Sequence, residues 1–194
     1  MIARMARWEP GARERLVLAA VDLFAEQGYD ATTVAQIAER AGVTKSTFFR
    51  HFPDKRELLA AGQDTLSRLL AEGITEAPAD ATPLTAVAAG LERASNAMGP
   101  LSRELGPRIK AAVAANAELQ ERDALKNVGL AAAMTDALLA RGVPRPTAHL
   151  AAELGVLAFK QGYAEWVGDH QDATLAPYTL AALDELRTAS QTLR

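Results

Sequence analysis

Apolar residues recur at intervals of three or four positions along most of this 194-residue chain, and Gly or Pro interrupts the pattern. Leu16, Ala20, Leu23 and Phe24 share one such face, and Gly28 is placed to end the segment. This period puts apolar side chains on one side of a helix. Ala and Leu, both strong helix formers, fill much of the pattern, whereas aromatic residues make up only 5% of the chain. The sequence therefore predicts an all-α fold.

Composition narrows the class of protein. No apolar run approaches the roughly 18 residues of a membrane span, and the first residues lack the apolar core of a secretory signal. The chain contains no cysteine, so neither a disulfide framework nor a thiolate metal site is expected. The net charge of −3 argues against indiscriminate binding to nucleic acid. We expect a cytoplasmic protein without a membrane partner.

The first third of the chain has the pattern of a helix-turn-helix. A helix is expected from 11 to 27, and a second, capped by Thr33, is expected over 34–41. Gly42 then supplies a turn, Thr44 caps a third helix over 44–51, and Pro53 ends it. A further helix is expected to start at Asp54 and to continue to about residue 74.

The stretch "VTKSTFFRHFPDKREL" (43–58) holds three of the five phenylalanines, interleaved with basic residues. It could be a buried strand, a small core helix with a solvated charged face, or a surface that meets an anion. The cap at Thr44, the stop at Pro53 and the i, i+4 spacing of Phe48 and Phe52 argue against the strand. Phe48 and Phe52 should then pack inward, and the positions left exposed to reach DNA are Lys45, Ser46, Phe49 and Arg50. Periodicity alone does not separate this interpretation from the core helix.

The segment "AAVDLFAEQGYDATTVAQIAERAGVTKSTFFRHFPDKRELL" resembles the DNA-binding domain of the TetR family of bacterial transcriptional regulators. The resemblance implies an all-α homodimer with a three-helix DNA-binding domain at residues 1–60, and a larger helical ligand-binding and dimerisation domain at 61–194, about nine helices in total. It implies contacts to bases or grooves from Lys45, Ser46, Phe49 and Arg50. It implies positions near phosphates for Thr44, Thr47, His51 and Lys55. The family usually has tyrosine at position 49, and Phe49 lacks the hydroxyl that would bond the DNA backbone.

The arm before this domain carries Arg4 and Arg7. These side chains could touch the minor groove or phosphates, or could belong to a tail without function.

Five further helices are expected near 83–98, 102–115, 118–141, 146–168 and 174–193. The last two have the pattern of a helical interface, and the resemblance places dimerisation there. Internal core helices are the alternative. The expected interface residues are Leu150, Leu154, Gly155, Leu157, Ala158, Gln161, Gly162, Tyr178, Ala182 and Leu186.

A ligand pocket is expected within the larger domain, with apolar walls and no metal or cofactor. Its candidate lining residues are Met98, Ile109, Val113, Met134, Phe159, Tyr163 and Trp166. The expected mechanism is that a ligand tilts the helix beginning at Asp54 and changes the spacing of two reading helices on a palindrome. The Gly106–Pro107 loop is the expected coupling point.

No catalytic motif is found. The three histidines lack metal-ligand spacing, and no phosphate-binding glycine loop or nucleophile elbow occurs. We therefore expect a ligand-responsive DNA-binding regulator rather than an enzyme, with a repressor released from its operator by a small lipophilic effector as the leading hypothesis. A helical ligand-binding or scaffold protein that does not bind DNA, and a regulator without an effector, are the alternatives.

Overall fold

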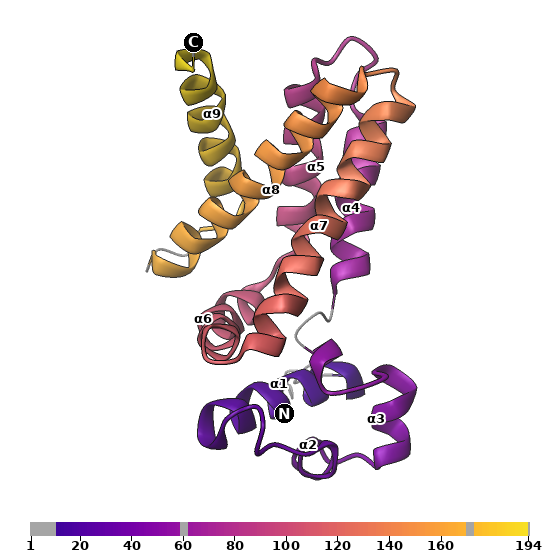
Figure 1. Ribbon diagram of the computed structural model, residues 1–194, viewed down its shortest axis with the longest axis vertical. Coiled ribbons are helices and arrows are strands. Elements are labelled where there is room, and N and C mark those ends of the chain that lie inside the picture. The colour runs from indigo at the N-terminus through magenta and orange to yellow at the C-terminus, as the bar shows by residue number, and fades with distance from the viewer. Residues whose placement is uncertain (1–10, 59–61, 170–172, 194) are drawn as a thin grey trace, which may run out of the picture. The chain divides into compact units, whose positions relative to one another are not determined.

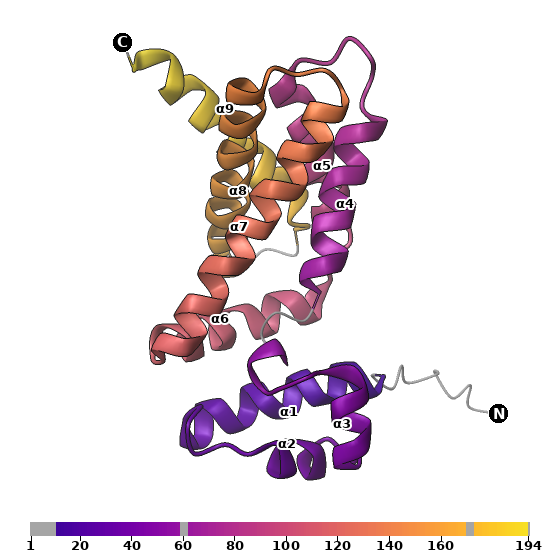
Figure 2. The same ribbon diagram turned by 45° about the vertical axis from the view of Figure 1, so that its right-hand side comes forward.

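The computed structural model describes residues 11–58, 62–169 and 173–193 (Figures 1 and 2). Arg4 and Arg7 lie outside these ranges. Within them the chain forms nine α-helices, one short 3-10 helix and no strand, which confirms the all-α prediction. The elements are α1 (Ala12–Gln27), α2 (Val34–Arg40), α3 (Lys45–His51), η1 (Arg56–Leu58), α4 (Gln63–Glu76), α5 (Pro83–Asn96), α6 (Pro100–Ala114), α7 (Ala117–Ala140), α8 (Arg145–Gly168) and α9 (Ala176–Thr192).

The bounds of α5 to α9 agree with the predicted ranges to within two residues. The prediction of a loop at Gly106–Pro107 is wrong, because both residues lie inside α6. Among the described helices, none combines the length and the apolar character that crossing a membrane requires.

The chain divides into two compact units. One comprises Met1–Ala61 and Arg108–Gln120, and the other comprises Gly62–Pro107 and Glu121–Arg194. The first unit therefore includes the end of α6 and the start of α7, far along the chain from the three N-terminal helices.

In the first unit, α1 packs against α2, α3 and η1 (Figure 2). The apolar core of this unit contains residues from all four elements, and within it Leu16 and Ile37 are fully buried and Phe24 is almost fully buried. An ion pair on the surface joins α1 to α2, where both Arg40 guanidinium nitrogens lie 2.9 Å from the oxygens of Glu26. These contacts fix α2 and α3 on the long α1 helix.

The prediction of one continuous helix from Asp54 to about residue 74 is wrong. The structure has the single turn η1 (Arg56–Leu58) and a separate helix α4 that begins at Gln63. Gly62 has a φ of 93°, a left-handed conformation that a continuous α-helix cannot contain. The sequence cap at Asp54 is real, but the helix that it starts is a short one.

In the second unit, α5 contacts α4, α8 and α9, and α8 packs along α9. Helix α7 adds Leu130, Met134 and Leu138 to the same core. Beyond α7, the Arg141 guanidinium donates to the carbonyls of Ile74 and Ala77 at 3.1 and 2.8 Å. Since the last carbonyls of a helix have no partner within it, Arg141 caps the end of α4.

Candidate nucleic-acid interface

The turn between α2 and α3 is built by capping and by one glycine. The Thr33 hydroxyl accepts from the amide of Gln36 at the start of α2, and the Thr44 hydroxyl accepts from the amide of Thr47 at the start of α3. Between the helices Gly42 has a φ of 66°, which favours glycine over any residue with a Cβ. Each of these positions has the residue type that its local conformation requires, so the helix-turn-helix is encoded locally.

Two phenylalanines hold α3 to the rest of the unit. Phe48 is 0% exposed and Phe52 is 2% exposed, with their ring centroids 5.9 Å apart. This confirms the prediction that both pack inward. Burying a side chain of this size contributes roughly 1.5–3 kcal/mol to folding, so the pair anchors the seven-residue helix.

The opposite face of α3 is exposed and has both polar and aromatic groups. Lys45, Ser46, Phe49 and Arg50 all lie on it, and the Phe49 side chain is 56% exposed. An Arg50 nitrogen lies 3.4 Å from the Thr47 hydroxyl, which holds the guanidinium loosely along the helix. Arg or Lys on an exposed helix face is the usual donor to guanine in the major groove.

His51 and the Thr44 hydroxyl lie at the two ends of α3 and are exposed as well. Thr44 uses its oxygen as the helix cap, and it lies 3.1 Å from the Thr47 hydroxyl. Free amides and small hydroxyl groups at a helix N-terminus are natural phosphate ligands.

Lys55 differs from the other predicted phosphate contacts because its ammonium is engaged within the unit. It donates to the carbonyls of Tyr29 and Thr32 at 2.7 and 3.0 Å, and its nitrogen lies 4.0 Å from the centre of the Tyr29 ring. Lysine has three N–H donors, so two are directed at the α1–α2 turn. Its position near phosphate remains a prediction, whereas its contact with the turn is observed.

Asp54 organises the turn that follows α3. Its carboxylate accepts from the amides of Arg56 and Glu57 at 2.9 and 3.2 Å and lies 2.9 Å from the Arg56 guanidinium. Burial works to raise the pKa of Asp54, but the hydrogen bonds and the guanidinium outweigh it and hold the pKa below its usual value. The ionised form therefore stabilises the turn.

The predicted ligand residues are divided between the two units. Ile109 and Val113 belong to the first unit, where Val113 packs against the core that contains Phe48. Met98 and Met134 belong to the second unit, where Met134 is 1% exposed in the core. These four residues therefore do not line one cavity within either unit.

The three aromatic candidates on α8 do lie together. The Phe159 and Tyr163 rings are stacked with centroids 6.1 Å apart, and the Tyr163 and Trp166 rings are 5.7 Å apart. Tyr163 donates to the Ser102 carbonyl and Trp166 to the Ala173 carbonyl, so both polar groups already have partners. Burial raises the pKa of Tyr163 above the usual value for tyrosine.

The predicted dimer residues separate into an inner and an outer set. Gly155, Ala158, Gly162 and Ala182 are buried against helices of the same chain. Leu154, Tyr178 and Leu186 are half-buried, whereas the exposed members are Leu150, Leu157 and Gln161.

Sequence reasoning missed the contribution of the α6–α7 region to the first unit. Leu119 is 1% exposed within that unit's apolar core, and the Tyr29 hydroxyl donates to Glu118 across 89 positions. An ion pair between Arg108 and Asp22 joins the same two parts of the chain. No periodic pattern carries this information, since each residue looks like an ordinary member of its own helix.

Comparisons with known proteins agree with this geometry. Residues 16–61 match the family model described as "Bacterial regulatory proteins, tetR family". The regulator TcmR of Streptomyces glaucescens is 39% identical over 75 residues, 39% of this chain and 33% of TcmR. The repressor Rv3405c of Mycobacterium tuberculosis is 44% identical over 66 residues, 34% of this chain and 35% of Rv3405c. The chain thus spans about a third of the length of these curated relatives.

The similarity in fold extends well beyond the matched segment. The crystal structure of FadR from Bacillus subtilis, solved with stearoyl-CoA, has a TM-score of 0.54 at 22% identity and covers 89% of this chain and 96% of that one. Residues 16–61 are thus similar to the N-terminal domain of the TetR family of bacterial regulatory proteins, and the helical fold of the chain is similar to that of FadR.

Proposed function

We propose that this protein is a homodimeric transcriptional regulator that binds a palindromic operator through residues 1–60. The observation that carries the proposal is that Lys45, Ser46, Phe49 and Arg50 are exposed on α3, whereas Phe48 is buried. A short capped helix with basic groups on its outer face fits the major groove. Lys45, on the first turn of α3, is the proposed base-reading residue.

Binding to the DNA directly upstream of the protein's own gene tests this proposal. A fluorescence anisotropy titration compares that duplex with a scrambled duplex at fixed salt, because affinity for DNA depends steeply on salt. Lys45→Ala should cost about 1–3 kcal/mol on the operator and little on the scrambled duplex. Equal losses on both duplexes would exclude base reading by Lys45, and no preference for any upstream duplex would favour a helical protein that does not bind DNA.

A second part of the proposal concerns residues 61–194, which we assign to dimerisation and effector binding. Leu150 and Leu157 are 61% and 41% exposed on α8, and one face of a long helix bearing such residues suits a contact between two copies. Analytical ultracentrifugation of Leu150→Asp with Leu157→Asp should yield monomers. A mass unchanged from the parent protein would place the interface elsewhere.

The proposed effector is a small lipophilic molecule, and its binding releases the operator. The aromatic side chains of Phe159, Tyr163 and Trp166, which lie together on α8, support an apolar ligand. Stearoyl-CoA is a first probe, because the FadR structure that contains it has a fold similar to that of this chain. An effector should raise the melting temperature and weaken operator binding together, since release requires unequal affinity for two states. A ligand that binds without changing operator affinity would favour a regulator that has no effector control.

A further inference from the structure

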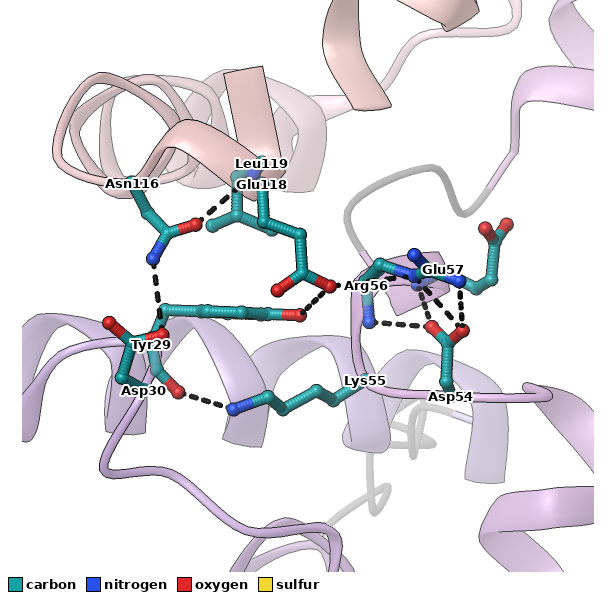
Figure 3. Close-up of polar contacts among 9 residues, drawn as sticks. All are labelled: Tyr29, Asp30, Asp54, Lys55, Arg56, Glu57, Asn116, Glu118 and Leu119. Carbon is teal, nitrogen blue, oxygen red and sulfur yellow. Dashed lines mark hydrogen bonds and ion pairs between the residues drawn. The ribbon is translucent and has the colours of Figure 1, made fainter. Parts of the chain in front are cut away.

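The start of α7 completes the core of the DNA-binding unit. Leu119 is 1% exposed in the apolar cluster that also contains Tyr29, Phe48 and Leu58. The neighbouring Asn116 uses its side-chain oxygen to accept from the Leu119 amide at 3.2 Å, which caps the first turn of α7. A segment remote in sequence is thus held in a defined conformation within this unit (Figure 3).

Polar contacts from the same segment converge on the α1–α2 turn. The Tyr29 hydroxyl donates to Glu118 Oε1 at 3.2 Å, and Asn116 donates to Asp30 at 3.3 Å. Arg56 Nε lies 3.6 Å from the same Glu118 oxygen, so that oxygen faces two groups. Burial, and next to it the Glu118 carboxylate, raise the pKa of Tyr29 well above the usual tyrosine value, so its hydroxyl remains a donor.

The other side of Tyr29 faces Lys55. Figure 3 shows the Glu118 carboxylate beside the tyrosine hydroxyl on one side and the Lys55 side chain running beneath the ring on the other. Lys55 also holds the Tyr29 carbonyl at 2.7 Å and lies four positions after the last residue of α3. Tyr29 therefore contacts both the α7 segment and the chain that leaves the reading helix.

We infer that Tyr29 is a positioning residue for DNA recognition, through which Glu118 orders the turn that supports α3. This inference rests on the proposed function. The hydrogen bond to Glu118 fixes the ring of Tyr29. The ring and the backbone carbonyl of Tyr29 in turn hold the Lys55 ammonium, and Lys55 thereby fixes the chain that follows His51. A reading helix that is already ordered loses less conformational freedom on binding, so docking of the segment favours the operator complex.

Two variants remove the contact, and two more serve as controls. Tyr29→Phe removes the hydroxyl but keeps the ring over Lys55, and Glu118→Ala removes the acceptor. Glu118→Gln retains an oxygen that can accept from Tyr29. Glu121→Ala removes an exposed carboxylate from the same helix, one turn further on, and so matches the change in charge.

Anisotropy titrations of the full chain, on operator and scrambled duplexes, provide the first measurement. Tyr29→Phe and Glu118→Ala should each weaken operator binding by about two- to tenfold, the equivalent of one hydrogen bond, with scrambled DNA unaffected. The double variant should be no weaker than Glu118→Ala alone, because Glu118→Ala already removes the bond to Tyr29 together with the contact to Arg56. Glu118→Gln and Glu121→Ala should bind as the parent does. Parent-like binding by Tyr29→Phe, or additive losses in the double variant, would overturn the inference.

Hydrogen exchange followed by mass spectrometry provides a second measurement that needs no DNA. Tyr29→Phe should speed amide exchange across Lys45–His51 relative to Glu121→Ala, since α3 loses a support. Unchanged exchange there would overturn the inference. If the parent protein prefers no upstream duplex, the proposed function fails, and the exchange experiment alone still decides whether Tyr29 orders α3.

Discussion

Gly162 lies where α8 packs closely against α9, and replacing it tests whether this approach stabilises the single chain. A Cβ at position 162 would lie 2.5 Å from the Thr179 amide nitrogen and 2.6 Å from its Cα. Both are backbone atoms, so no side-chain rotation can relieve the overlap. Ordinary contact begins at about 3.4 Å, which means that α9 would have to move away by close to 1 Å.

That movement also has a cost beyond the local clash. The Thr179 hydroxyl lies 3.0 Å from the Ser95 hydroxyl of α5, and both side chains are fully buried. Overpacking of a dense core typically costs 1–3 kcal/mol, and a buried hydroxyl left without its partner costs a further ~1–3 kcal/mol. We therefore expect Gly162→Ala to destabilise the protein by about 2–6 kcal/mol.

Urea denaturation monitored by circular dichroism measures this effect. Gly168→Ala is the matched control, because it lies at the end of the same helix and its Cβ would meet nothing within 4 Å. The Gly162→Ala loss should be the same at low and high protein concentration, since it arises within one chain, whereas weakened dimerisation would make the loss concentration-dependent. Equal stability of the two variants would refute the packing argument.

Three further outcomes are expected. Phe48→Ala should destabilise the protein by about 3–5 kcal/mol in urea denaturation, whereas Phe49→Ala, at an exposed position, should stay within about 0.5 kcal/mol; comparable losses would contradict the assignment of inner and outer faces. The pKa values of Tyr29, Tyr163 and Tyr178 are all raised, so their contribution to stability is present up to the unfolded value of about 10 and is lost as pH rises above it. An absorbance titration at alkaline pH should show the tyrosines of the folded protein ionising at higher pH than free tyrosine. The pKa of Asp54 is lowered, so its contribution to the free energy of unfolding is present above the unfolded value of 3.8 and is lost as pH falls below it. Asp54→Asn should therefore reduce the dependence of the unfolding free energy on pH in acid. An unchanged dependence would assign it to other carboxylates.

Local chemistry made much of the fold predictable. Thr33, Gly42 and Thr44 each specify the conformation of the turn around them, and the spacing of Phe48 and Phe52 defines which side of α3 is buried. These signals lie within a few residues of the structure that they determine. The helix expected from Asp54 was wrong because these signals did not reach far enough. The cap at Asp54 could be identified from the sequence, but the positive φ of Gly62 could not.

Long-range docking was not predictable in the same way. Glu118 and Leu119 look like a solvated carboxylate and one more apolar position on a long helix, and only the folded chain places them beside Tyr29. The pairing depends on how the α6–α7 turn is directed in space. A single sequence without a periodic or motif signal contains no local trace of such a contact.

The small residues of α8 illustrate a subtler ambiguity. Gly155, Ala158 and Gly162 indicate a helix face built for close approach, but a small side chain does not specify which helix approaches. The structure places α9 of the same chain against Gly162 and Val87 of α5 against Gly155. The exposed Leu150 and Leu157 lie on the same helix, and we propose that they contact a second copy of the chain. The small residues of α8 can thus pack within the chain while its large exposed residues remain available to a second chain. Close packing within the chain and the proposed dimerisation therefore place separate, compatible requirements on the sequence of α8.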